Sequence, residues 1–430
     1  MVPTGRVPLL LLAGLAPVVV WPSGWTVAGW LVLVAAAVAA DARLAADPAD
    51  LGFARTPLGS VRVGEETATE LRVANRSRRT ARLLMRDAWQ PSAGATRNRH
   101  RRTLAPGEEA ALLTPLLPRR RGDLTAVGVT VRSYGPLGLG ARQQTGTVPG
   151  ALRALPAFGS RKHLPSRLRL LRELDGRTAV RVRGQGTEFD SLREYVRGDD
   201  VRSIDWRASA RSRTVVVRTW QPERDRHVVI VLDTSRTSAG RIGDVPRLDS
   251  AMDAALLLAS LATRAGDRVD VVAGDRQTRV RVRTGGTRDA AARLQDAFAT
   301  VQPALVEADW TALAGAVAQL ARHRALVVLL TPLEPAAVEE SLLPVLPTLV
   351  RHHRVVVASV GDPTLSALAR ERGTVAEVYA AAAAERAALR RRRTATTLGA
   401  LGVDVVEGDA ESLPPALADH YLLLKARGLL

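Results

Sequence analysis

The side chains best placed to do chemistry follow an apolar run in the second half of the chain. Residues His227–Leu232 have the pattern of a buried parallel strand, and Asp233, Ser235 and Thr237 come directly after it. In a sheet of parallel strands, ligands bind beyond the carboxyl ends of the strands. A carboxylate and two hydroxyls at alternate positions direct oxygens at one point, and Mg²⁺ or Mn²⁺ prefer oxygen ligands. The pattern has two interpretations: a divalent-cation site, or a loop that only caps the next helix.

A second group of charged and aromatic residues lies between Gly186 and Arg211. It contains six acids and five arginines around a turn signal, Gly198-Asp199-Asp200. Bidentate pairs between arginine and carboxylate can lock such a segment. Three interpretations stay open: a structural clamp between domains, a surface that docks a partner, and a catalytic carboxylate site. The candidate residues are Glu188, Phe189, Arg193, Tyr195, Gly198, Asp199, Asp200, Arg202, Asp205, Trp206 and Arg211.

Several common active sites are missing from the sequence. There is no cysteine, which excludes disulfides, thiolate metal sites and a cysteine nucleophile. There is also no phosphate-binding P-loop, no H-E-x-x-H and no G-x-S-x-G motif. We therefore expect a protein that is not an enzyme and has no catalytic residue. The alternative is a metal-dependent enzyme that uses the acidic segment 188–205 together with Asp233.

The chain is strongly basic, with 430 residues and a formal net charge of +18. Only two of its 61 basic residues are lysine, so codon bias of a GC-rich genome and attraction to a polyanion are both open explanations. The arginine-rich runs lack interleaved aromatic residues, and we expect no specific nucleic-acid partner. The sequence predicts no oligomeric state. These runs are 97–102, 119–121 and 390–393.

The first 40 residues carry one charged side chain, Arg6. Two apolar runs, Val7–Trp21 and Trp25–Ala40, are separated by a Pro-Ser-Gly turn. This pattern predicts a hairpin of two transmembrane helices, with a single span or a cleaved signal peptide as the alternatives. Arginines flank both ends of the hairpin, which predicts a multi-pass protein of the cell membrane with its soluble domains in the cytoplasm.

The remaining chain divides into three segments, following the transmembrane hairpin assigned to residues 1–45. Residues 46–150 alternate in hydropathy over short stretches, which predicts an all-β, immunoglobulin-like sandwich. Residues 151–225 form a connector that contains the charged segment. Residues 226–430 alternate between apolar strands and helical patterns, which predicts an α/β fold with a doubly wound parallel sheet.

The order strand, D-x-S-x-T, helix resembles the von Willebrand factor A (vWA) fold and its metal-ion-dependent adhesion site. The resemblance implies a further threonine from a second loop, for which Thr311 is the candidate. It also implies an aspartate from a third loop, near Pro332, where this chain has none. Glu334 is a possible substitute, although Pro332 disturbs the loop. A working Mg²⁺ or Mn²⁺ site and a degenerate vWA domain without a metal therefore both remain open.

The charged segment closely resembles the hallmark of the bacterial domain-of-unknown-function family 58. The matching parts are G-x-E-F at 186–189, L-R-x-Y at 192–195, G-D-D-x-R-x-I-D-W at 198–206 and A-S-A-R at 208–211. The resemblance implies a membrane-anchored, vWA-like protein-interaction module. It also implies a partner, an AAA+ ATPase of the MoxR type, and a role as adaptor in the assembly or maturation of other proteins.

Overall fold

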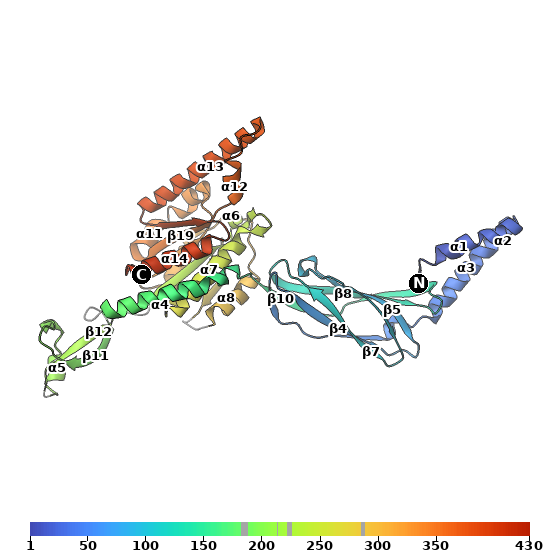
Figure 1. Ribbon diagram of the computed structural model, residues 1–430, viewed down its shortest axis with the longest axis horizontal. Helices are drawn as coiled ribbons and strands as arrows, with labels where there is room; N and C mark the ends of the chain where they lie inside the picture. Colours follow the sequence, from blue (N-terminus) through green and yellow to red (C-terminus); the bar gives the residue numbers. More distant parts are fainter. Residues whose placement is uncertain (182–187, 213, 222–225, 285–288) are drawn as a thin grey trace. The chain divides into compact units, whose positions relative to one another are not determined.

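The computed structural model describes residues 1–181, 188–212, 214–221, 226–284 and 289–430 (Figure 1). It divides into two compact units, Met1–Leu155 and Pro156–Leu430. The first unit contains the apolar amino terminus and the predicted β region. The second contains most of the predicted connector together with the α/β region.

The amino terminus forms three helices, α1 (Val7–Ala13), α2 (Leu15–Val20) and α3 (Gly24–Leu44). The first apolar run is interrupted at Gly14, where an added Cβ would lie 2.3 Å from the Trp30 ring of α3. The Trp30 indole N–H also donates to the carbonyl of Leu10 at 3.1 Å. Among the described residues, only the stretch Gly24–Asp50 is long and apolar enough to cross a membrane. The prediction of two transmembrane helices is therefore not supported. The structure supports a single apolar helix that fits a membrane anchor or a signal sequence.

The end of α3 is fastened to the β region through a buried carboxylate. Asp41 accepts hydrogen bonds from the backbone N–H groups of Leu137, Leu139 and Gly140 at 2.7–2.9 Å. Strand β1 (Val2–Pro3), which precedes α1, pairs with β9 (Gly140–Gly146). Both ends of the helical hairpin are thus held at the loop between β8 and β9.

The rest of the first unit consists of two sheets. The larger sheet contains β1, β3, β5, β6, β8, β9 and β10, and the smaller one has the order β2-β4-β7. Alternation in β4 buries Leu71 and Val73, which share one core with Leu83 and Met85 of β5. The β-rich prediction is confirmed at this level. The remaining strands are β2 (Leu51–Arg55), β3 (Ser60–Arg62), β4 (Thr67–Asn75), β5 (Ala81–Trp89), β6 (Arg99–Leu104), β7 (Glu109–Leu116), β8 (Gly122–Tyr134) and β10 (Ala151–Leu155).

The second unit is built on a six-stranded sheet with the order β17-β16-β13-β18-β19-β20. In chain order this is 3-2-1-4-5-6, so the direction of winding reverses between β13 and β18. The sheet is mixed and not wholly parallel, because β17 returns from β16 through a tight turn and pairs antiparallel. The strands are β13 (His227–Asp233), β16 (Arg268–Gly274), β17 (Thr278–Arg283), β18 (Leu326–Leu330), β19 (Arg354–Val360) and β20 (Asp404–Gly408).

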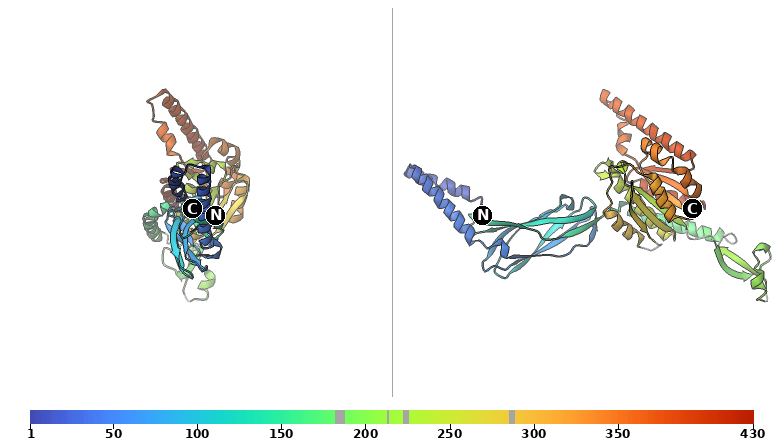
Figure 2. Two further views of the ribbon diagram at one scale, coloured as in Figure 1. Left: turned by 90° about the vertical axis from the view of Figure 1, so that its right-hand side faces the viewer. Right: turned by 180° about the vertical axis from the view of Figure 1, so that it is seen from behind.

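Helices cover both faces of this sheet, as the alternation predicted (Figure 1). One face packs against α4 (Leu164–Arg181), α7 (Arg247–Arg264), α8 (Ala290–Ala299) and α14 (Leu413–Ala426). The other packs against α9 (Trp310–Leu320), α11 (Leu346–His352) and the carboxyl-terminal part of α13 (Val375–Ala400). Together with α12 (Pro363–Leu368), the rest of α13 extends past the sheet (Figure 2).

Candidate functional site

Asp233 is the last residue of β13. It therefore lies at the edge of the sheet where the direction of winding reverses between β13 and β18. Its side chain is buried, and its Oδ1 accepts a hydrogen bond from the backbone N–H of Ser235 at 2.7 Å. Its Oδ2 accepts from the hydroxyls of Thr237 at 3.1 Å and Thr331 at 2.7 Å. The Ser235 and Thr237 hydroxyls lie 3.0 Å apart. The predicted convergence of oxygens at this edge is therefore present.

A short helical segment, α10 (Pro335–Ala337) with the π-helical turn Val338–Leu342, lines the same cavity and leaves about 10 Å³. That space holds at most one water molecule. Burial raises the pKa of Asp233, and the hydrogen bonds from Ser235, Thr331 and Thr237 offset this only partly. The geometry is that of a carboxylate sealed in the protein interior.

The residues predicted to complete a metal site do not gather around Asp233. Thr311 has an exposed side chain and is not among the residues that line the cavity. Glu334 instead forms an ion pair with Arg247, at 3.0 Å between Oε1 and NH1. Besides Thr237, the hydroxyl that reaches Asp233 is that of Thr331, because β18 lies beside β13 and Thr331 follows its last residue. Thr331 was not among the residues that the sequence predicted for this site.

The arrangement around Asp233 does not fit a hydrated divalent cation. Mg²⁺ is usually bound through one or two carboxylates and keeps several waters. Here a single carboxylate already accepts three hydrogen bonds, and the cavity has no room for those waters. Within the described ranges, no group of three acids or histidines is placed to hold a metal.

The charged segment forms a separate structure, here called the arm: strands β11 (Glu188–Glu194) and β12 (Val216–Gln221) with the turns between them. Arg193 binds Asp199 through two hydrogen bonds of 2.8 and 2.5 Å, and the backbone N–H of Val196 also donates to Asp199. The Arg193 guanidinium, followed by that N–H, lowers the pKa of Asp199. The turn itself needs Gly198, whose φ of 114° favours glycine.

The other two aspartates of the hallmark are also used inside the arm. Asp200 accepts from the backbone N–H of Arg202 at 2.9 Å and caps a short 3₁₀ turn. Asp205 accepts from two backbone N–H groups at the start of α5 (Trp206–Ser209) and pairs with Arg218 of β12 at 2.7 Å. The Ala208 N–H and then Arg218 lower the pKa of Asp205. These carboxylates stabilise the turns of the arm itself. These contacts lie within the arm, so the predicted clamp between domains stays a prediction.

Apolar and basic side chains remain on the outside of the arm. Trp206 is 67% exposed, and Val196 and Val201 are 61% and 59% exposed. In the part of the chain that the structure describes, four exposed arginines of the arm form no ion pair: Arg197, Arg202, Arg207 and Arg211. Tyr195 is half-buried, and its N–H donates to Val215. Glu188 and Phe189 lie in β11, but their side chains, like residues Gly186 and Thr187, lie outside the described part.

Fold and site together define a protein with a β-rich unit bearing an apolar helix, and an α/β unit whose charged arm is internally paired. Residues 191–396 match the family model described as "Protein of unknown function DUF58". The resemblance to domain-of-unknown-function family 58 is thereby confirmed for these residues.

Three uncharacterized proteins of Mycobacterium are similar to this chain, one from Mycobacterium bovis and two from strains of Mycobacterium tuberculosis. Each is 28% identical over 152 residues, which are 35% of this chain and 48% of the relative. The chain thus spans about half the length of the curated relatives that it matches.

Similarities to solved structures are weak. Escherichia coli α2-macroglobulin is 12% identical with a TM-score of 0.19, over 25% of this chain and 7% of that chain. A Caenorhabditis elegans member of the MSP family, WR4, is 11% identical with a TM-score of 0.18, over 24% of this chain and 96% of that chain.

Proposed function

We propose that this protein is a membrane-anchored interaction module and not an enzyme, and that its arm docks on an acidic partner protein. The observation that carries the proposal is that the aspartates of the arm are bonded within the arm, which leaves its exposed surface basic and aromatic. Asp199, Asp200 and Asp205 are all engaged within the arm, whereas Trp206 and the four arginines face outward. Tryptophan and arginine are the residues most enriched among the energetic centres of protein interfaces.

The membrane anchor is α3, with α1 and α2 beside it. An apolar helix near an amino terminus fits an anchor or a signal sequence, and the contacts of this one favour an anchor. Cleavage after Ala40 would remove β1 from its pairing with β9, together with the hydrogen bond from the Thr4 hydroxyl to Gly138 at 2.6 Å. The flanking Arg6 and Arg43 support a location of the other parts of the chain on the cytoplasmic side of the cell membrane, because positive residues are enriched on that side.

The partner that we propose is an AAA+ ATPase of the MoxR type, which the resemblance to family 58 implies. The function would be that of an adaptor in the assembly or maturation of other proteins. A vWA-like fold for residues 226–430 is supported by the strand order 3-2-1-4-5-6 and by the position of Asp233. The closed cavity at Asp233 favours a degenerate form of that fold, without Mg²⁺ or Mn²⁺.

The proposal is tested with the full chain in detergent micelles and the purified MoxR-type ATPase from the same genome. We expect saturable binding, and a Trp206→Ala variant that binds at least ten-fold more weakly, which corresponds to about 1.4 kcal/mol. Tyr379→Ala is the matched control, because it removes an aromatic side chain that is 75% exposed on α13. Absence of binding by the unaltered chain would reject the ATPase as partner. Equal affinities of Trp206→Ala and the unaltered chain would reject the arm as the docking surface.

A further inference from the structure

A cavity of about 580 Å³ lies at the edge of the α/β sheet opposite to Asp233. It is lined by the first residues of two neighbouring parallel strands, by the last residue of β17, and by the end of α9 with the segment that follows it. Among its described lining residues are four arginines and two histidines and no carboxylate. The lining residues are His227, Arg268, Arg283, Gln319, Leu320, Arg322, His323 and Arg324.

The sheet brings three of these basic residues together on one face. His227 and Arg268 are directly paired in the parallel register, and Arg283 is paired with Asp270 across the antiparallel edge. Alternation along β13 places His227 on the face of Val229, which packs against α9. That helix ends at Leu320. Beyond its end, α9 no longer covers this face of the sheet, and the basic residues line the cavity there.

A buried carboxylate beneath the cavity holds two of the basic groups. Asp270 is fully buried, and its Oδ2 lies 3.0 Å from Nε2 of His227 and 2.8 Å from NH2 of Arg268. Burial opposes ionisation of Asp270, but these two contacts outweigh it and lower its pKa. Asp270 is therefore charged at neutral pH and positions His227 and Arg268 at the cavity.

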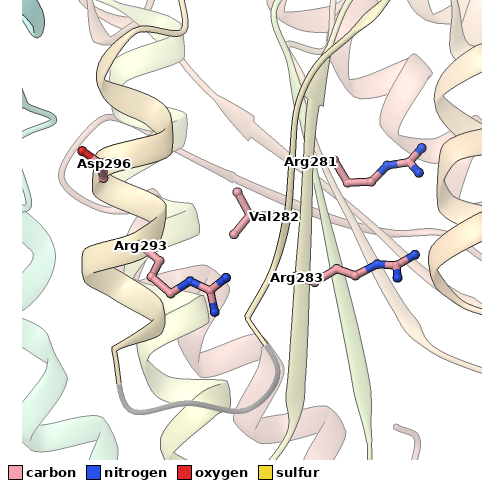
Figure 3. Close-up of a pocket in the computed structure, with 5 residues that line it drawn as sticks. All are labelled: Arg281, Val282, Arg283, Arg293 and Asp296. Atoms are coloured by element: carbon pink, nitrogen blue, oxygen red, sulfur yellow. The ribbon is translucent and has the colours of Figure 1, made fainter.

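The other arginines are not neutralised by neighbouring acids. Within the described part of the chain, Arg283, Arg322 and Arg324 form no ion pair, and all three are exposed. Figure 3 shows the hollow on the opposite side of β17, where Val282 points toward α8 while Arg281 and Arg283 point the other way. Arg283 lines both this hollow and the cavity, whereas Arg293 of α8 lines the hollow and is not among the residues that line the cavity.

We propose that this cavity binds a compact, multiply charged phosphate ligand, such as a free oligophosphate or the triphosphate of a nucleotide. Arginine suits phosphate because its planar guanidinium donates two parallel hydrogen bonds. The volume lies in the range of small-molecule sites. No aromatic residue other than histidine lines the described cavity, and Leu320 is its one apolar side chain, so the phosphates and not a base are recognised. This site is independent of the arm and of the partner proposed above.

Binding is tested by calorimetry on the full chain in micelles, with sodium tripolyphosphate and ATP as probes in 150 mM NaCl. We expect both to bind with affinities within about three-fold of each other, since each offers the same three phosphates. An Arg283→Gln/Arg324→Gln variant should bind both at least ten-fold more weakly. Arg293→Gln removes a nearby exposed arginine from the other side of β17 and should stay within two-fold of the unaltered chain.

Three results would overturn the proposal. Absence of measurable binding of tripolyphosphate at this salt concentration would mean that only diffuse attraction to a basic chain remains. Binding of ATP without tripolyphosphate would show that the base is the recognised part. Equal weakening by Arg293→Gln and by the double variant would assign the effect to net charge. Melting curves of all variants without ligand serve as a control. Coinciding curves would show that a loss of phosphate binding is not caused by unfolding.

Discussion

Asp233 shows how a residue with the right type and position for a metal ligand can serve the protein interior. Its two oxygens accept three hydrogen bonds, one from a backbone N–H and two from hydroxyls. Hydroxyl groups can donate to an ionised carboxylate, or rotate and accept from a neutral group. The cluster therefore tolerates either protonation state, while burial favours the neutral one.

The first prediction concerns the pH dependence of stability at Asp233. Because burial raises its pKa in the folded protein, its contribution to stability is complete below the pKa of the unfolded chain and is lost as pH rises through the folded value. Asp233→Asn cannot ionise and should escape that loss. The melting temperature of Asp233→Asn relative to the unaltered chain should therefore increase as the pH rises from about 4, the ordinary pKa of an aspartate, towards pH 8.

Scanning calorimetry at several pH values measures this difference, and a difference that stays constant or falls would contradict it. Adding Mg²⁺ or Mn²⁺ at each pH separates the two interpretations of the site. A cation that raises the melting temperature of the unaltered chain, but not that of Asp233→Asn, would establish a working metal site.

At the residue scale, the sequence predicted local groupings better than contacts between distant segments. The convergence of Asp233, Ser235 and Thr237 follows from their spacing after one strand. The contact with Thr331 depends on which strand lies beside β13, and that order cannot be read from periodicity. Similarly, the sequence predicted that arginines and carboxylates pair within the arm, but it did not predict every partner. Asp205 pairs with Arg218, which lies outside the hallmark and comes close to Asp205 only when β12 forms.

At the scale of elements, the junction between α3 and the β unit depends on very close backbone approach. An added Cβ on Gly140 would lie 2.3 Å from the carbonyl oxygen of Val38, and one on Gly135 would lie 2.2 Å from that of Asp41. A Cβ atom and a carbonyl oxygen cannot approach this closely, so the backbone of one of the two segments would have to move. The apolar pattern of the first 40 residues predicted a helix here, but not the glycines, 100 residues further along, that seat it.

The second prediction is that Gly140→Ala loosens this junction. Overpacking of this kind costs about 1–3 kcal/mol, and the N–H groups that Asp41 binds should lose protection from hydrogen exchange. Gly146→Ala at the other end of β9 is the control, because nothing lies within 4 Å of its added Cβ. Hydrogen exchange of residues 137–140 in the full chain measures the effect, and equal protection in both variants would show that the junction does not need close contact.

At the scale of the whole molecule, the third prediction concerns orientation across the membrane. The chain has no cysteine, so single cysteines can report which side of the membrane each position faces. The arm position Ser212→Cys and the position Ser412→Cys beside α14 should react with a membrane-impermeant maleimide only after cells are permeabilised. Labelling of either position in intact cells would reject the cytoplasmic assignment.

Composition and periodicity predicted the β-rich unit and the α/β unit, since buried strands and amphipathic helices each have a characteristic pattern of apolar residues. They did not predict the break at Gly14, where Trp30 of α3 packs against the backbone. They also did not single out the basic cavity, whose residues come from four separate segments.

The attachment of the helical hairpin at both of its ends has a mechanical consequence. A helix tethered at one end swivels about its linker, but this hairpin enters from β1 and leaves through Asp41 at the same loop of the sheet. With α3 as the membrane anchor that we propose, a change in bilayer thickness that tilts α3 would also rotate the β unit. Lipid composition could in this way set the angle at which that unit stands on the membrane surface.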